Sequence, residues 1–191
     1  MIVTPDSELD AINEILTAIG SSPVNSLEDD ANADVINARS MLYRVSREVQ
    51  SKGYLFNTEY EVELLPDFYT KKIQFPNSFI RVIGNRGNYV RRDGFFFDLT
   101  ERTFKFPDGI TLSTLVREVN FEDLPEAARK MITARSARIF QARYLSAQEL
   151  DAELQQAESQ AQGDLLDYEL ETSGYNIYSN DAFVQQQIQR N

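Results

Sequence analysis

Apolar side chains recur at intervals of three and four residues in two stretches near the N-terminus, which is the spacing of one face of an α-helix. The first stretch predicts a helix over residues 7–19, ended by Gly20. Its apolar stripe consists of Leu9, Ile12, Leu16 and Ile19. The second stretch predicts a longer helix over residues 31–52, ended by Gly53. Its apolar stripe consists of Val35, Ala38, Leu42, Val45 and Val49.

The period changes to two in the middle of the chain, which predicts β-strands. In residues 58–64, TEYEVEL, apolar and hydroxyl side chains alternate with glutamates, so one face should be packed and the other solvated. Short apolar runs follow, separated by Pro, Asn and Gly: KKIQF, FIRVI, NYVRRDGFFFDL, RTFKF and GITLSTLVREV. Asp93-Gly94 is the signal of a tight hairpin. The pattern predicts an antiparallel meander of about five or six strands, without parallel crossovers.

Helical spacing returns in residues 124–145, which carry Pro125 in the first turn and many small side chains that permit close packing. Ser146 and Glu149 then have the spacing of a capping box, which predicts a fourth helix that ends near Gly174. Its apolar stripe consists of Leu150, Leu154, Ala157, Ala161, Leu165 and Tyr168.

The order helix, helix, sheet, helix, helix, tail predicts an α+β fold. A four-helix bundle interrupted by an antiparallel β-meander or barrel-like domain, with an extended C-terminal tail, joins these elements by short connections. The predicted parts are a first helical half, a β domain, a second helical half and the tail: residues 1–53, 54–120, 121–173 and 174–191.

The last segment carries apolar side chains that a free tail does not need. Tyr175, Tyr178, Phe183 and Ile188 lie among Asn, Gln and Ser. Because a lone extended segment cannot bury them, they predict an interface with another chain.

Composition excludes much catalytic and metal chemistry. The 191 residues include no His and no Cys, so the usual general base, a thiolate nucleophile and zinc sites of His or Cys are absent. No apolar run approaches the roughly 18 residues of a membrane span, so no membrane association is expected. The N-terminus does not resemble a signal peptide, so synthesis in the cytoplasm is expected.

The net charge of −11 is unevenly distributed. Residues 1–30 contain seven acidic residues and no basic one, and residues 146–191 contain nine acidic residues and one basic one. Residues 71–145 contain fourteen basic and eight acidic residues. Either these parts face each other within one monomer, or acidic and basic sides of neighbouring copies meet head to tail, which closes a ring where the rotation permits.

The stretch LEDDANADVINARSM, residues 27–41, has carboxylates and an amide at alternate positions, as in a calcium loop. These residues are Asp30, Asn32 and Asp34. The match stops there, because Val35 stands where the loop needs Gly and Met41 where it needs a bidentate Glu. A helix N-cap at Asp29 or Asp30 explains the stretch better. No metal site, cofactor site or catalytic residue is predicted.

Two further clusters of residues each allow a structural and a functional interpretation. Glu59, Glu61 and Glu63 are better interpreted as a solvated strand face than as carboxylates for glycoside hydrolysis. A basic run lies among aromatic residues, a pattern typical of nucleic-acid binding. It comprises Arg81, Arg86, Arg91 and Arg92, with Tyr89 and Phe95–Phe97. Its acidic flanks and strand spacing favour an electrostatic protein contact instead.

An ordered set of motifs resembles one family, the tail tubular protein A, or adaptor protein, of short-tailed autographivirus-type bacteriophages. The motifs are LTAIGSSPVNSLEDDANADVINAR, SKGYLFNTE, LLPD, YVRRDGFFFD, GYN and DAF. They run in order from about Ser7 to Phe183 and cover nearly the whole chain.

The resemblance implies a structural virion protein of the phage tail, assembled in the host cytoplasm, with no cofactor and no catalytic motif to transfer. It implies a dodecameric ring between the portal protein and the tail nozzle (tubular protein B). The ring would continue the DNA channel without specific DNA binding and offer attachment to tail fibres. The four apolar tail residues would then contact the portal or a neighbouring subunit.

Two other classes of function remain open on the sequence. One is a carboxylate-based glycan hydrolase of the virion tail, which an acid pair in a cleft of the β domain would favour and dispersed acids would count against. The other is a free-standing cytosolic binding module, which would be a monomer with a folded tail.

Overall fold

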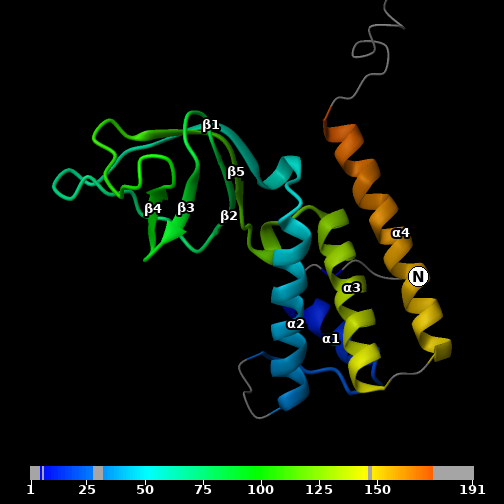
Figure 1. Cartoon of the computed structure of the whole chain (residues 1–191). Helices are drawn as coiled ribbons and strands as arrows, with labels where there is room; N and C mark the ends of the chain where they lie inside the picture. The colour runs from blue at the N-terminus through cyan, green and yellow to red at the C-terminus, as the bar shows by residue number, and fades with distance from the viewer. Residues whose placement is uncertain (1–4, 6, 28–31, 146–147, 174–191) are drawn as a thin grey trace, which may run out of the picture. The chain divides into compact units, whose positions relative to one another are not determined.

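A computed structural model of the chain describes residue 5 and residues 7–27, 32–145 and 148–173 (Figure 1). The chain divides into two compact units, residues 1–38 with 125–191, and residues 39–124. We call the first the helical unit and the second the β unit. The described residues form helices and antiparallel strands, which is compatible with the predicted α+β class.

The helical unit contains α1 (Glu8–Thr17), α3 (Glu126–Tyr144), α4 (Gln148–Thr172) and the first turns of α2 (Ala33–Gln50). Helix α3 packs against both α1 and α4, and Figure 1 shows α4 running alongside α3. Helix α3 is buried on several faces, which its small side chains permit. Its buried small residues are Ala128, Ala134, Ser136 and Ala137.

Ion pairs join α4 to α3 along the polar side of the contact. Lys130 Nζ lies 2.5 Å from a carboxylate oxygen of Asp164. The guanidinium of Arg138 lies 3.2 Å from Asp151 and 3.0 Å from Glu158. The predicted four-helix bundle is not confirmed, because most of α2 belongs to the β unit.

The ends of α1 follow its sequence signals. The Ser7 hydroxyl accepts a hydrogen bond from the Asp10 N–H, and the Asp10 carboxylate accepts one from the Ser7 N–H, which is a capping box. At the other end Gly20 has φ +76°, and the N–H of Ser21 bonds to the carbonyl of Leu16. These contacts satisfy backbone groups that a helix end leaves free.

The β unit contains an antiparallel sheet of three strands in the order β1-β5-β2 and a hairpin, β3-β4. The strands are β1 (Thr58–Leu64), β2 (Phe79–Gly84), β3 (Tyr89–Arg92), β4 (Phe95–Asp98) and β5 (Ile110–Arg117). The predicted meander is therefore wrong in its order, because the last strand lies between the first two. The described strands form no closed barrel, so a barrel-like domain is not confirmed.

Two predicted strands do not form ladders. KKIQF contributes a single bridge from Gln74 to Phe95, and RTFKF a single bridge from Thr103 to Asp98. Both runs are apolar because they fill the core of the β unit, not because they pair as strands. That core consists of Ile73, Phe75, Phe79, Phe96, Phe106, Ile110, Leu112 and Leu115. Rings of Phe75 and Phe96 lie 4.6 Å apart between centroids.

The predicted alternation of half-buried and exposed side chains in β1 holds except at Tyr60. Val62 and Leu64 pack against the core, but Tyr60 is 65% exposed. The backbone of Glu61, between Tyr60 and Val62, has φ +50°, a left-handed conformation that a regular strand does not contain. The alternation of inward and outward side chains is interrupted at Glu61, so Tyr60 is not buried in the core with Val62.

Candidate interaction surfaces

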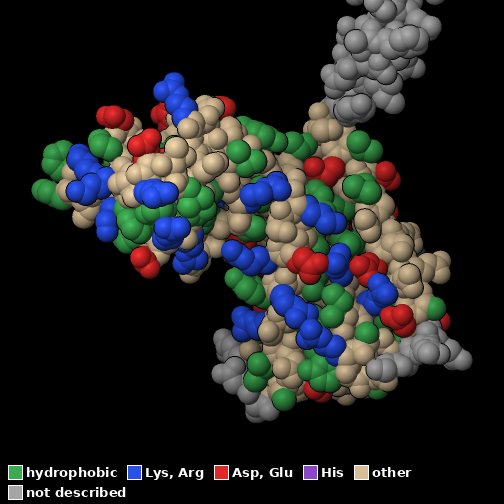
Figure 2. Space-filling view, viewed as in Figure 1, with side chains coloured by type: hydrophobic (Ala, Val, Ile, Leu, Met, Phe, Trp, Pro, Cys, Tyr) green, Lys and Arg blue, Asp and Glu red, His purple; other side chains and the backbone are tan. Residues whose placement is uncertain are grey.

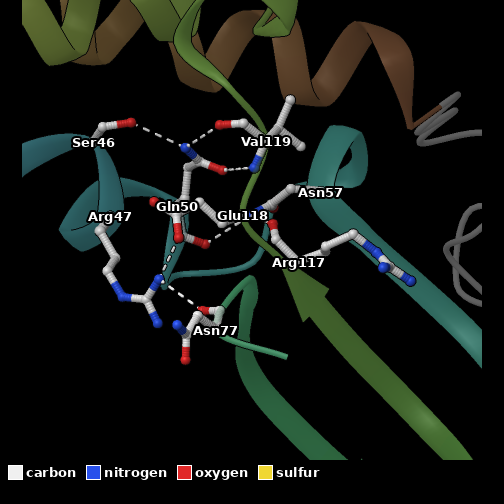
Figure 3. Close-up of polar contacts among 8 residues, drawn as sticks. All are labelled: Ser46, Arg47, Gln50, Asn57, Asn77, Arg117, Glu118 and Val119. Atoms are coloured by element: carbon white, nitrogen blue, oxygen red, sulfur yellow. Dashed lines mark hydrogen bonds and ion pairs between the residues drawn. The ribbon is translucent and has the colours of Figure 1, made fainter. Parts of the chain in front are cut away.

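Gln50, the last residue of α2, is the centre of a buried polar network that joins this helix to the end of β5 (Figure 3). Its side-chain Nε2 donates to the carbonyl of Val119 and to Ser46 Oγ, both at 3.0 Å. Its Oε1 accepts from the Val119 N–H at 2.8 Å. Gln50 is fully buried, so each of these bonds replaces one with water.

Asn57 extends the network in the turn before β1. Its Nδ2 donates to the Gln50 carbonyl at 2.9 Å and to the Arg117 carbonyl at 3.1 Å. Arg47, one turn before Gln50, pairs with Glu118 and donates to the Asn77 carbonyl at 3.2 Å (Figure 3). These bonds place residues 39–50 with the strands, so the network is structural.

The loop between β1 and the core, residues 65–72, is the most exposed apolar feature described in the β unit. Leu65 is 80% exposed, Phe68 76% and Tyr69 88%. We call residues 65–72 the aromatic loop. At the tip of the β unit Figure 2 shows apolar side chains beside basic ones. Exposed rings of this size on a well-formed loop are typical of a contact surface.

Hydrogen bonds to Asp67 hold the aromatic loop in one conformation. Its Oδ1 accepts from the Thr70 N–H and hydroxyl, each at 2.8 Å, and from the Tyr69 N–H at 3.2 Å. The backbone N–H of Lys71 bonds to the Asp67 carbonyl. The N–H and hydroxyl of Thr70 lower the pKa of Asp67 below its ordinary value, with smaller contributions from Tyr69 and Lys71.

A pocket of about 390 Å³ opens beside the base of this loop. Its lining includes Glu63, Arg86, Tyr89 and Asp108. Two carboxylates in one pocket are the feature that would favour a glycan hydrolase. Both are exposed, however, whereas a glycosidase general acid has its pKa raised by burial. Burial and then the charge of Asp98 raise the pKa of Tyr89, which keeps its hydroxyl protonated.

A second exposed apolar patch lies near the C-terminal end of α4. Leu166 is 52% exposed and Leu170 56% exposed, one helical turn apart on the same face. Asp167 and Glu171 follow them in the sequence and are also exposed. We call these four residues the α4 patch. Figure 2 shows apolar and acidic side chains next to one another at this end of α4.

The residues of the candidate calcium loop that the structure describes take part in helix capping. Asn32 Oδ1 accepts from the Asp34 N–H at 2.9 Å, and the Asn32 carbonyl accepts from the Ile36 N–H. The carboxylate of Asp34 accepts from Ser21 Oγ at 3.2 Å. The predicted caps, Asp29 and Asp30, lie outside the described residues, as does Asp30 as a calcium ligand. Asn32 is the N-cap that sequence reasoning missed, although an amide before a helical stripe is such a signal.

The basic run divides among several structural roles. Arg81 donates to the Lys52 carbonyl at the end of α2, where the helix dipole favours a cation. Arg92 stacks on the ring of Phe97 at 4.0 Å. Tyr89 and Phe96 pack into the β core, so these two rings are not presented to nucleic-acid bases.

The predicted interface residues Tyr175, Tyr178, Phe183 and Ile188 lie outside the described residues, as do Ser146 and Gly174. In the part of the chain that the structure describes, no group of three or more acidic side chains is placed to hold a metal ion. No described helix is long and apolar enough to cross a membrane.

Sequence reasoning missed both exposed patches. The aromatic loop is visible in the sequence only as two rings after Pro66-Asp67, a turn signal that does not report exposure. Leu166 and Leu170 lie off the predicted stripe of the fourth helix, and that misfit was the available signal.

Comparison with known protein families identifies a relationship that covers most of the chain. The model of the family named Tube, described as tail tubular protein, matches residues 9–175. No curated protein matches the chain.

Proposed function

The chain belongs to the tail tubular protein family, and from this premise we propose that its copies form a ring between the portal protein and the nozzle of a phage tail. The family is one of structural phage tail proteins, not of enzymes. The match carries the proposal because it spans both the helical unit and the β unit. In the proposed role the ring is dodecameric, continues the DNA channel and offers attachment to tail fibres.

The charge of the two units supports contacts between copies. Residues 1–38 and 125–191 contain eighteen acidic and six basic residues, whereas residues 39–124 contain twelve acidic and thirteen basic ones. The helical unit is therefore strongly acidic and the β unit nearly neutral, with most of the basic residues of the chain. Acidic surfaces of one copy can meet basic side chains of the next, and head-to-tail contacts of this kind close into a ring where the rotation permits.

The channel wall is proposed to be acidic. DNA binds tightly to cationic surfaces, because each phosphate contact releases counterions. A channel through which DNA slides should therefore have few cationic side chains on its wall. Segment 1–30 or segment 146–171 is the candidate for the lumen, since both are strongly acidic. The isolated chain should then bind DNA negligibly, which a gel-shift assay at low salt would test.

The C-terminal segment is proposed to attach the ring to the portal. Tyr175, Tyr178, Phe183 and Ile188 are apolar side chains in an otherwise polar stretch. Each would contribute about 1.5–3 kcal/mol when buried against another subunit, reduced by the cost of ordering the segment.

A glycan hydrolase is the alternative, and the pocket with Glu63 and Asp108 is the observation in its favour. It predicts release of sugars from host envelope glycans that Glu63→Gln or Asp108→Asn abolishes. The exposure of both carboxylates favours the structural role.

The decisive experiment is assembly of the purified chain, alone and with the portal protein of the same phage, at low and high salt. Light scattering should report a large complex in at least one of these settings, and negative-stain images should show rings. A monomer in every setting would overturn the ring and favour a free-standing binding module.

A further inference from the structure

We propose that the aromatic loop of one copy docks on the α4 patch of a second copy, and that this contact links neighbouring subunits. The inference rests on the proposed ring and names the surfaces that form it. It is carried by three properties of these surfaces: exposed apolar side chains on both, opposite charge, and a location on different units.

The loop is suited to insertion because it is already ordered. Asp67 binds Tyr69 and Thr70, and the Phe106 N–H bonds to the Lys71 carbonyl, which ties the loop to the β core. The rings of Phe68 and Tyr69 contact edge to face, 5.3 Å apart. A preorganised loop loses little conformational freedom on binding, so most of the burial of its rings contributes to affinity.

Lys71 places a positive charge beside the exposed rings. Its Nζ lies 4.9 Å from the centroid of the Phe68 ring, and its charge also acts on the carboxylate of Asp67. The loop therefore presents two exposed rings and two lysines, Lys71 and Lys72, against one carboxylate, Asp67, and it fits an apolar surface that is flanked by carboxylates.

The α4 patch is such a surface, and its charges are unfavourable in the single copy. Asp167 and Glu171 are like charges one turn apart, which repel. They also lie near the C-terminal end of α4, where the helix dipole disfavours anions, and the last turn contains no basic residue. Lys71 from a second copy would relieve both effects while Phe68 and Tyr69 cover Leu166 and Leu170.

The contact joins two different surfaces, because the loop belongs to the β unit and the patch to the helical unit. Each copy then offers one loop and one patch. Where the loop of each copy docks on the patch of the next, the contact is heterologous and its repetition produces a closed ring or an open filament. Two copies that exchange loop and patch reciprocally would instead form a two-fold dimer. The head-to-tail arrangement is the one that the proposed function requires.

Disulfide trapping tests the contact directly, because the chain contains no cysteine of its own. Tyr69→Cys and Leu170→Cys are made in separate full-length chains, mixed, assembled with the portal protein and oxidised. The expected product is a dimer that contains one chain of each kind. The double variant should form a ladder of covalent oligomers. The control mixes Tyr69→Cys with Tyr43→Cys, a 61% exposed residue of α2.

The outcomes separate this inference from the proposed function. If rings form but the Tyr69→Cys and Leu170→Cys mixture cross-links no more than the control mixture, the proposed contact is wrong. The proposed ring would still stand in that case. A double variant that forms only a disulfide within one chain also overturns it. Failure of the wild-type chain to assemble in any setting overturns both the contact and the ring.

Charge reversal provides an independent measurement on the assembled ring. Lys71→Glu should weaken association about tenfold or more, and the combination with Glu171→Lys should recover much of the loss. Lys105→Glu is the matched control, since Lys105 is an exposed cation of the β unit outside the loop. Equal effects of the two lysine substitutions, without recovery by Glu171→Lys, would contradict the contact.

Discussion

The side-chain amide of Gln50 forms two hydrogen bonds with the backbone of Val119, one as donor at 3.0 Å and one as acceptor at 2.8 Å. Gln50 ends α2 and Val119 follows β5, so residues 69 apart in sequence are joined at one point. The pairing resembles a rung of a β-ladder, with a side chain in place of a second backbone. It explains why most of α2 groups with the strands and not with the other helices.

Replacing Gln50 by leucine should lower the free energy of unfolding by about 1–3 kcal/mol. The substitution keeps the apolar bulk but leaves the buried N–H and carbonyl of Val119 without partners. Ser46→Ala is the control, because it removes one bond and leaves the pairing with Val119 in place. Urea denaturation would measure both, and equal losses would contradict the central role of Gln50.

Asn32→Ala should lower the free energy of unfolding by about 1 kcal/mol, because it removes the N-cap of α2. Asn37→Ala, at an exposed interior position of the same helix, should cost nothing because alanine favours helix. Added calcium should leave the melting temperature of the wild-type chain unchanged. A rise of several degrees with calcium would show that the stretch is a metal loop after all.

Glu14 should make folding less favourable as the pH rises. Burial raises its pKa above the ordinary value of 4.5, so the folded state holds this proton more tightly than the unfolded state. Its contribution to stability is greatest below the unfolded pKa and is lost as the pH rises through the folded pKa. Glu14→Gln should therefore gain stability relative to wild type on going from pH 4 to pH 7. Denaturation curves at both pH values would measure this, and a constant difference would contradict it.

Two glycine substitutions should act in opposite directions, although an added Cβ meets no atom within 4 Å at either site. Gly94 has φ +79° in the β3-β4 turn, so Gly94→Ala should destabilise the chain by about 1–2 kcal/mol. Gly163 lies inside α4, so Gly163→Ala should stabilise it by about 1 kcal/mol. Thermal denaturation tests the pair. The same sign for both would show that contacts, and not backbone conformation, decide the effect.

Deletion of residues 175–191 should leave the circular dichroism of the two units unchanged and abolish co-sedimentation with the portal protein. The expected cause is loss of the four apolar docking side chains of this segment. Phe183→Ala alone should weaken attachment measurably. Full attachment of the truncated chain would exclude the segment as the docking element, and unfolding would assign it to the core of the monomer.

Local patterns in the sequence were sufficient for the helices and the tight hairpin. The stripe from Val35 to Val49 is buried as predicted, because a period of three to four residues turns one face of α2 inward whatever lies against it. Asp93-Gly94 forms the β3-β4 turn with positive φ at both residues, since the turn type is set by the conformations that these two residues allow. The family resemblance also came from the sequence, through motifs kept in order along the chain.

The tertiary structure alone decided the order of the strands and which apolar side chains are buried or exposed. Strand β5 enters between β1 and β2, a choice among distant partners that no local pattern encodes. Hydrophobicity did not reveal that Phe96 is fully buried while Phe68 is exposed, because burial depends on what the rest of the chain places over a ring. Gln50 is the converse case: a polar residue at a helix end is buried because Val119, far along the chain, supplies the partners that water would otherwise provide.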